Sequence, residues 1–308
     1  MQNQQQTQQP VKVKRTFIPG DEWLYYKIYT GPKTADIVLS EVIQPLADQM
    51  LAAGVIDRWF FIRYGDPKMH IRVRFHFNGN GAAGQIVPAV KQALDPFVAE
   101  DLVWKVMMDT YQREIERYTP AGMELAEEMF FHDSRMIAQM IGMIEGDEGE
   151  TIRWLFSLRC IDQLLKDFQY TMEDRRDLME GLKTGFGREF GMNKALREQL
   201  KSKFRKERPL IEDVMDYEKD EESEMLPLFD LLRQKSEATR PVVERVLALH
   251  KEDRLGRTMN DLMGSYIHML NNRLFKSKQR IHEMVVYDFL WNYYKSTIAR
   301  RKYDKNKK

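Results

Sequence analysis

The segment His70–Phe77 alternates strictly between polar and apolar side chains and constrains the fold more than any other stretch. Side chains of a β-strand point alternately to its two faces, so the segment is predicted to be a strand with one buried face. The apolar positions, which would face the core, are Ile71, Val73, Phe75 and Phe77. The positions that share the opposite face are His70, Arg72, Arg74 and His76.

This polar face places four potentially cationic groups in one row. Such groups repel each other unless an anion lies over them, so the row is a candidate anion-binding site. The alternative is a solvent-exposed face of an antiparallel sheet, whose cations pair with carboxylates of a neighbouring strand. From this segment alone the solvent-exposed face is slightly favoured.

The rest of the chain divides into two regions of different character. Further strands are predicted at Glu22–Tyr29, Trp59–Tyr64 and Leu102–Thr110, and helices at Ala35–Gly54 and Gln85–Val98. Helical spacing then dominates, and the predicted helices are 122–144, 150–168, 172–183, 193–206, 226–250 and 259–298. We predict an α+β fold, in which an antiparallel-rich sheet in the N-terminal part packs with a large helical part.

Both ends of the chain are predicted to lie outside the folded domain. Residues 1–15 are polar and expected to be disordered, and residues 299–308 are expected to be a basic, frayed C-terminal tail. Because no linker composition interrupts residues 16–298, they are predicted to form a single domain. The helical pattern is expected to break near Pro241 and near Phe275.

Composition argues against several classes of protein. The 48 Lys and Arg residues nearly balance the 47 Asp and Glu residues, which argues against a dedicated nucleic-acid binder. The single cysteine, Cys160, excludes an intrachain disulfide and fits a reducing compartment. No uncharged apolar run is long enough to span a bilayer, and residues 1–10 do not resemble a secretory signal. We therefore expect a soluble, cytoplasmic protein. Because no HExxH or paired-cysteine spacing occurs, no metal site is predicted.

A second candidate group follows the strand at 102–110. Glu114 and Arg117 are three residues apart, so in a helical turn they would be neighbours. A carboxylate beside an arginine holds the guanidinium in one orientation, which suits recognition of a second carboxylate. The alternative is a surface ion pair worth about 0.5 kcal/mol, and on its own this alternative is favoured.

The third candidate is His268, which lies among apolar residues of a predicted helix. Histidine is the side chain best suited to proton transfer near neutral pH, and Asn272, one turn later, could orient it. The alternative is a hydrogen-bonded core histidine, which is favoured for an isolated case.

Taken in chain order, these pieces resemble the C-terminal domain of the lantibiotic dehydratase family, which also occurs in thiopeptide biosynthesis proteins. The resemblance spans about Thr16 to Tyr294. The matching features are Trp23–Tyr29, Trp59–Tyr64, His70–Phe75, Tyr111, Glu114, Arg117-Tyr118, Phe131–Ser134, His268-Met269, Asn272-Arg273, Gln279-Arg280 and Glu283.

The resemblance implies a lyase of lanthipeptide biosynthesis. Dehydratases of this family use glutamyl-tRNA to esterify Ser and Thr of a precursor peptide, and a second domain eliminates glutamate to leave dehydroalanine or dehydrobutyrine. This chain resembles the second domain only, which implies a glutamylated precursor peptide as substrate and a separate glutamyl-tRNA-dependent glutamylation protein as partner. The family also suggests a homodimer, with no metal, organic cofactor or direct nucleic-acid contact.

The resemblance also assigns roles to individual residues. The predicted catalytic residues are Arg72, Arg74, Arg117 and His268, and the predicted substrate-binding residues are Glu114, His70 and Tyr111. The arginines would bind the glutamyl group and stabilise negative charge, Glu114 would orient Arg117, and His268 would transfer a proton. One departure is Thr119-Pro120, where relatives have glycine after the Arg-Tyr pair, so the shape of this loop is an open question.

Two other functions fit the same sequence. Thiopeptide pyridine synthases, which join two dehydroalanines by a formal cycloaddition, have a similar fold. They need not bind a glutamyl carboxylate, so the arginine pair favours elimination. The other alternative is a non-catalytic subunit that holds a peptide by strand addition to a sheet edge.

Overall fold

The computed structural model describes residues 13–79, 81–144, 146, 148–217 and 223–307. A four-stranded antiparallel sheet has the order β3-β4-β2-β5, and a two-stranded sheet pairs β1 with β6. The strands are β1 (Thr16–Phe17), β2 (Trp23–Thr30), β3 (Arg58–Tyr64), β4 (His70–His76), β5 (Val103–Asp109) and β6 (Tyr111–Gln112). The predicted strands and the α+β class are confirmed.

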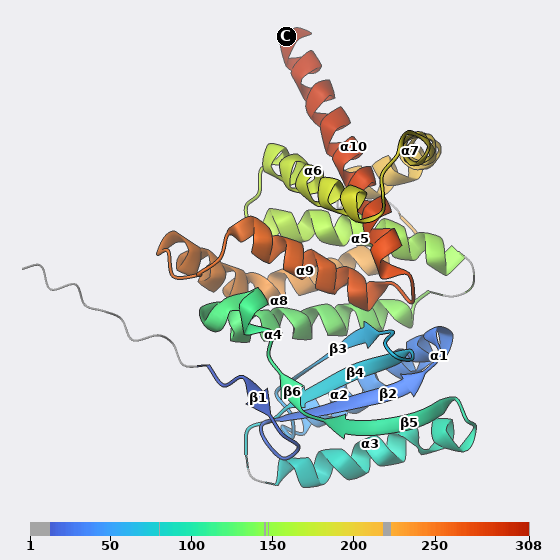
Figure 1. The fold of residues 1–308 in the computed structure, drawn as a ribbon, viewed down its shortest axis with the longest axis vertical. Coiled ribbons are helices and arrows are strands. Elements are labelled where there is room, and N and C mark those ends of the chain that lie inside the picture. Colours follow the sequence, from blue (N-terminus) through green and yellow to red (C-terminus); the bar gives the residue numbers. More distant parts are fainter. Residues whose placement is uncertain (1–12, 80, 145, 147, 218–222, 308) are drawn as a thin grey trace, which may run out of the picture.

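The helices form two groups (Figure 1). Three of them lie against the large sheet: α1 (Pro32–Ile37), α2 (Gln44–Ala52) and α3 (Ala82–Ala99). The π-helical turn η1 (Val38–Ile43) joins α1 to α2. The others form the helical part: α4 (Ile115–Ile141), α5 (Glu148–Asp167), α6 (Met172–Glu189), α7 (Lys194–Asp216), α8 (Leu226–Lys251), α9 (Met259–Leu274) and α10 (Gln279–Lys307). None of the described helices is long and apolar enough to cross a membrane.

Two expectations about breaks and ends are wrong. Helix α8 continues through Pro241. The proline leaves the main-chain carbonyl of Glu237 without a helical partner, but both residues are exposed, so water can bind this carbonyl. The expected frayed tail at 299–308 is instead helical through Lys307, the end of α10 (Figure 1). Alanine, arginine and lysine are strong helix formers, and Arg300 pairs with Glu212 of α7 at 3.0 Å. The break near Phe275 is confirmed. Of the expected N-terminal tail, residues 1–12 lie outside the described residues.

The helical part docks on the free edge of strand β3. The main-chain N–H of Phe61 donates to Ser134 of α4 at 3.1 Å. Asn272 of α9 accepts from the main-chain N–H of Arg63 at 2.8 Å and donates to its carbonyl at 2.9 Å. An edge strand otherwise exposes unpaired main-chain groups, so these two side chains satisfy three of them on the outer edge of β3. They also fix α4 and α9 beside the strand that neighbours β4.

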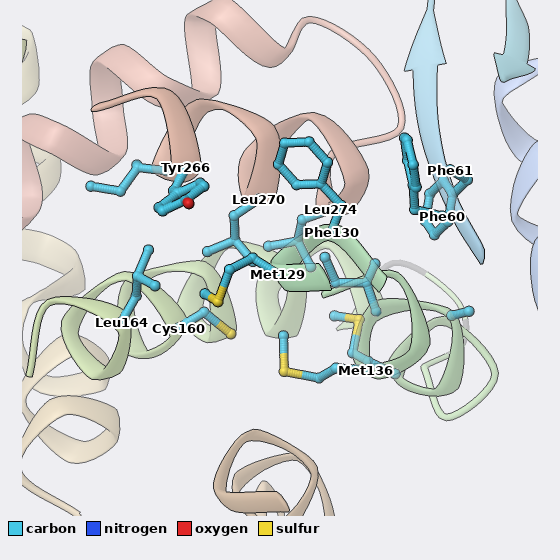
Figure 2. Close-up of a cluster of buried hydrophobic side chains, with 14 of the residues drawn as sticks. Phe60, Phe61, Met129, Phe130, Met136, Cys160, Leu164, Tyr266, Leu270 and Leu274 are labelled. Carbon is cyan, nitrogen blue, oxygen red and sulfur yellow. The ribbon is translucent and has the colours of Figure 1, made fainter. Parts of the chain in front are cut away.

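An apolar cluster holds this junction together. Figure 2 shows side chains of α4, α5 and α9 interdigitating, with the aromatic rings of β3 at one end. Its labelled members are Phe60, Phe61, Met129, Phe130, Met136, Cys160, Leu164, Tyr266, Leu270 and Leu274. Cys160 is a core residue, and burial raises the pKa of its thiol. Because Tyr266 lies within this cluster, the turn of α9 that carries His268 has a fixed position.

Asp36 of α1 links the sheet to the helical part through buried charges. Its two carboxylate oxygens contact Arg63 of β3 and Arg153 of α5, the latter at 2.8 Å. Arg63 and Arg153 are 4% and 1% exposed, so neither can turn to solvent if the carboxylate is lost. Lys276 lies 3.7 Å from the same carboxylate.

Asp36→Asn is therefore expected to lower the free energy of unfolding by about 3–5 kcal/mol, because it removes the carboxylate that both buried guanidinium groups contact. Among the described residues, Arg153 keeps only the more distant carboxylate of Glu150, at 3.7 Å. Urea denaturation followed by circular dichroism measures this change. The control is Asp95→Asn, whose partner Lys91 is exposed, with an expected change of at most about 0.5 kcal/mol. Equal effects of the two substitutions would contradict the prediction.

Candidate functional site

The predicted row of cations on β4 does not form an open solvent face. The β2 residues opposite His76, Arg74, Arg72 and His70 are Trp23, Tyr25, Lys27 and Tyr29. Arg74 and His70 are 7% and 1% exposed. A neighbouring strand rich in aromatic residues supplies no carboxylate for the central arginines, so the solvent-exposed alternative fails for Arg74.

Arg74 is a buried guanidinium that forms no ion pair with any described residue. Its Cζ lies 4.4, 5.0 and 4.7 Å from the ring centroids of Tyr25, Phe60 and Tyr111. Its Nε and Nη1 are buried and have no hydrogen-bond partner in the part of the chain that the structure describes. Burial lowers the pKa of Arg74, and the nearby groups that favour the charged form, Tyr111, Tyr25 and Glu114, offset this only in part. A buried charge is normally paired, so Arg74 has free donors for an anionic ligand.

The ring of Tyr111 packs against the guanidinium of Arg74, and a buried hydrogen-bond network holds this ring in place. Its hydroxyl donates to buried Glu127 at 2.7 Å, and Arg113 binds the same carboxylate through two nitrogens at 2.8 and 2.7 Å. The hydroxyl of Tyr111 is thus occupied, and its ring face contacts Arg74. Tyr111 and Glu114 also line a narrow cavity of about 40 Å³ beside Arg74, to which α9 contributes Met269.

Arg72 and His70 form a linked pair further along β4. Nε of Arg72 donates to Nε2 of His70 at 3.1 Å, and the other ring nitrogen of His70 donates to the carbonyl of Lys68 at 2.8 Å. Burial lowers the pKa of His70, in keeping with a neutral ring. The guanidinium of Arg72 stacks on the ring of Tyr64, 3.5 Å from its centroid. The structure therefore places His70 as a support for Arg72.

Glu114 and Arg117 form the predicted pair, with Nε of Arg117 3.0 Å from the carboxylate. The carbonyl of Arg117 accepts a hydrogen bond from Arg257 at 2.6 Å. After this turn Thr119 has φ +63° and ψ 160°, a conformation that favours glycine. The departure from the family sequence at Thr119-Pro120 thus coincides with a strained backbone conformation at Thr119. The hydroxyl of Thr119 accepts a hydrogen bond from the main-chain N–H of Gly122 at 3.2 Å.

His268 is oriented by α10 and not by Asn272, which instead binds Arg63 of the sheet edge. Nδ1 of His268 lies 2.9 Å from the buried carboxylate of Glu283. A carboxylate only accepts, so Nδ1 carries the proton and donates to Glu283. The side-chain amide nitrogen of Gln279 lies further away, 3.2 Å from Nδ1, and Nε2 has no hydrogen-bond partner among the described residues. Gln279 donates to the main-chain carbonyl of His268 at 2.9 Å.

A cavity of about 490 Å³ brings Arg117 and His268 together from distant parts of the chain. Arg257, Ser265 and Arg280 also line it. Neighbouring residues line this cavity and the small one beside Arg74. Arg117 lines this cavity and pairs with Glu114, which lines the small one. His268 lines this cavity, and the next residue, Met269, lines the small one. Of the predicted residues, Arg72 and His70 line neither cavity.

Three site residues received no role from the sequence. Gln279 and Glu283, one turn apart at the start of α10, were among the features of the family resemblance, and their helical spacing could have been matched to His268. Arg257 has no local signal, because its contact with the carbonyl of Arg117 joins residues 140 positions apart. Among the described residues, no group of three or more His, Cys, Asp or Glu side chains could hold a metal ion.

Comparison with protein families gives a match to one family model, described as lantibiotic biosynthesis dehydratase C-term, over residues 23–294. A curated relative, the subtilin biosynthesis protein SpaB of Bacillus subtilis, is 25% identical over 281 residues, which are 88% of this chain and 25% of SpaB. The nisin biosynthesis protein NisB of Lactococcus lactis is 29% identical over 134 residues, which are 43% of this chain and 13% of NisB. The chain thus spans at most about a quarter of these relatives.

Solved structures show the same fold. The tRNA-dependent lantibiotic dehydratase MibB from a Microbispora species matches with a TM-score of 0.68 and 21% identity, over 94% of this chain and 29% of MibB. The pyridine synthase TbtD from thiomuracin biosynthesis matches with a TM-score of 0.62 and 14% identity, over 89% of this chain and 99% of TbtD. At these identities the likeness establishes the fold alone.

Proposed function

The chain belongs to the lantibiotic biosynthesis dehydratase C-terminal family, and on that premise we propose that it eliminates glutamate from glutamylated Ser and Thr residues of a precursor peptide. The products are dehydroalanine or dehydrobutyrine in the peptide and free glutamate. In this proposal, a separate glutamyl-tRNA-dependent protein supplies the glutamylation step.

The observation that carries the proposal is the unpaired, buried guanidinium of Arg74. A buried cation without a counter-ion costs stability and is retained where a ligand supplies the negative charge. A glutamyl ester carries a free carboxylate, and elimination releases a second one. Arg74 and Arg72 lie on one face of the sheet. Glu114, which lines the cavity beside Arg74, pairs with Arg117. These arginines would supply the positive charge for both carboxylates.

The reaction removes the Cα proton of the esterified residue, forms the Cα=Cβ bond and breaks the Cβ–O bond, so glutamate leaves as its carboxylate. Negative charge develops first on the peptide carbonyl and then on the leaving group. Fixed guanidinium groups stabilise such charge. The free Nε2 of His268 is the proton-transfer atom, and Glu114 orients Arg117.

Pyridine synthesis is the second candidate, and one observation favours it: the fold match covers 99% of the TbtD chain. Pyridine synthesis joins dehydroalanines, which carry no glutamyl carboxylate. It therefore gives no reason for an unpaired buried arginine beside the cavity. A non-catalytic scaffold gives no reason for the His268–Glu283 contact next to Arg117.

The test is to incubate a synthetic peptide bearing one glutamylated serine with the purified protein and to record intact masses. Elimination is expected to lower the peptide mass by one glutamic acid and to release free glutamate in equal amount. Protein inactivated by heating is the control. If the glutamylated peptide is unchanged while a peptide with two dehydroalanines is cyclised, the assignment moves to pyridine synthesis.

A further inference from the structure

A second large cavity, of about 750 Å³, lies between α6, α7 and α10. Helix α6 separates it from the candidate active site, because Leu182 lines the active-site cavity while the next residue, Lys183, lines the second one. Its volume lies within the range of protein ligand-binding pockets. None of the residues assigned to elimination lines it.

The cavity carries an excess of positive charge that the chain does not neutralise. Lys183 pairs with Asp288 at 2.6 Å, and Asp288 is buried. Four further cations line the cavity without an ion-pair partner in the described part of the chain: Arg188, Arg197, Lys201 and Lys295. Glu198 is the other carboxylate in the lining. An anionic ligand would therefore be attracted into this cavity.

The walls favour a peptide over a nucleic acid. The ammonium groups of Lys183 and Lys295 lie over the indole of Trp291, 3.8 and 4.6 Å from its ring centroid. Single-stranded nucleic acids are bound by stacking of their nucleobases on free aromatic faces. A nucleobase would have to displace both ammonium groups before it could stack on this indole. Met192 and Leu200 add apolar surface that suits peptide side chains.

We infer that this cavity binds an acidic segment of the peptide substrate, at a distance from the residue that undergoes elimination. The identity of the ligand as part of the substrate rests on the proposed function. The carboxylates of the segment contact Arg188 and Arg197, and its apolar side chains pack against Met192 and Leu200. Such a site holds the substrate while successive residues enter the active site on the other side of α6.

The test measures binding by fluorescence anisotropy, with a fluorescein-labelled synthetic peptide in which glutamate alternates with leucine and glycine. The double variant Arg188→Glu/Arg197→Glu is expected to weaken binding about tenfold or more, because two attractive contacts become repulsive. Arg188→Gln/Arg197→Gln should give a smaller loss in the same direction. The matched control is Arg245→Glu/Lys251→Glu on α8, which reverses two exposed charges elsewhere and should leave binding unchanged.

Equal weakening by the cavity and control variants, or no weakening by either, overturns the inference. So does tighter binding of a single-stranded RNA of equal charge that depends on the same arginines. Binding is measured without turnover, so it is independent of the elimination assay. If the protein binds the acidic peptide through Arg188 and Arg197 yet does not eliminate glutamate, the proposed function falls and the acidic-peptide site stands.

Discussion

Arg74→Met is expected to lower kcat/KM for glutamate elimination on the order of 100-fold or more while leaving the protein folded. The guanidinium is the buried, unpaired cation beside the cavity lined by Tyr111 and Glu114. Methionine fills a similar volume but offers no positive charge and no N–H donor to the glutamyl carboxylate. Single-turnover release of glutamate from the glutamylated peptide measures the loss.

The stability of the same variant separates a catalytic role from a structural one. Arg74 has no counter-ion to leave behind, so Arg74→Met should lower the free energy of unfolding by no more than about 1 kcal/mol, in contrast to the large loss expected for Asp36→Asn. Arg58→Gln, on the neighbouring strand and paired with Asp57, is the control for activity and should keep it. A variant that loses stability and activity in parallel would show that Arg74 serves the fold.

Much of the sheet could be predicted because local sequence decides it. Strict alternation in His70–Phe77 identified the strand and both of its faces, and the antiparallel register places Lys27 and Tyr25 opposite Arg72 and Arg74. The burial of the polar face could not be predicted. It depends on Phe60 and Tyr111, which come from other strands and close over Arg74.

The helical part shows where local rules fail. A proline usually ends or bends a helix, but Pro241 lies on the water-facing side of α8, where solvent can satisfy the carbonyl it leaves unpaired. The basic composition of the C-terminus suggested fraying, yet α10 continues to Lys307. At Pro241 the solvent exposure of the helix decides whether it continues, and at the C-terminus the helix propensity of alanine, arginine and lysine acts together with the contact between Arg300 and Glu212.

The candidate site combines local and long-range information. The Glu114–Arg117 pair follows from a spacing of three residues, and the structure forms it. The meeting of Arg117 with His268 in one cavity depends on how α4 and α9 dock along the edge of β3, through Ser134 and Asn272. Asn272 was expected to orient His268, but its amide completes the sheet edge, and Gln279 and Glu283 of α10 take that role.

His268→Ala is expected to lower kcat for elimination by about 10²–10⁴-fold, because a positioned acid or base contributes a factor of that size. The carboxylate of Glu283 fixes the proton on Nδ1 and leaves Nε2 to face the substrate, so the loss should be in kcat more than in KM. His250→Ala, an exposed histidine on α8, is the matched control and should keep the wild-type rate.

Glu283→Gln distinguishes proton transfer from simple packing. The amide oxygen of glutamine can still accept from Nδ1, so this variant should lose only about tenfold in kcat, much less than His268→Ala. The carboxylate also accepts from Tyr287 at 3.2 Å and contacts Arg280 at 3.3 Å, so circular dichroism and the unfolding midpoint must accompany the kinetics. If His268→Ala keeps more than about a third of the wild-type kcat, proton transfer belongs to another group, and the proposal for His268 fails.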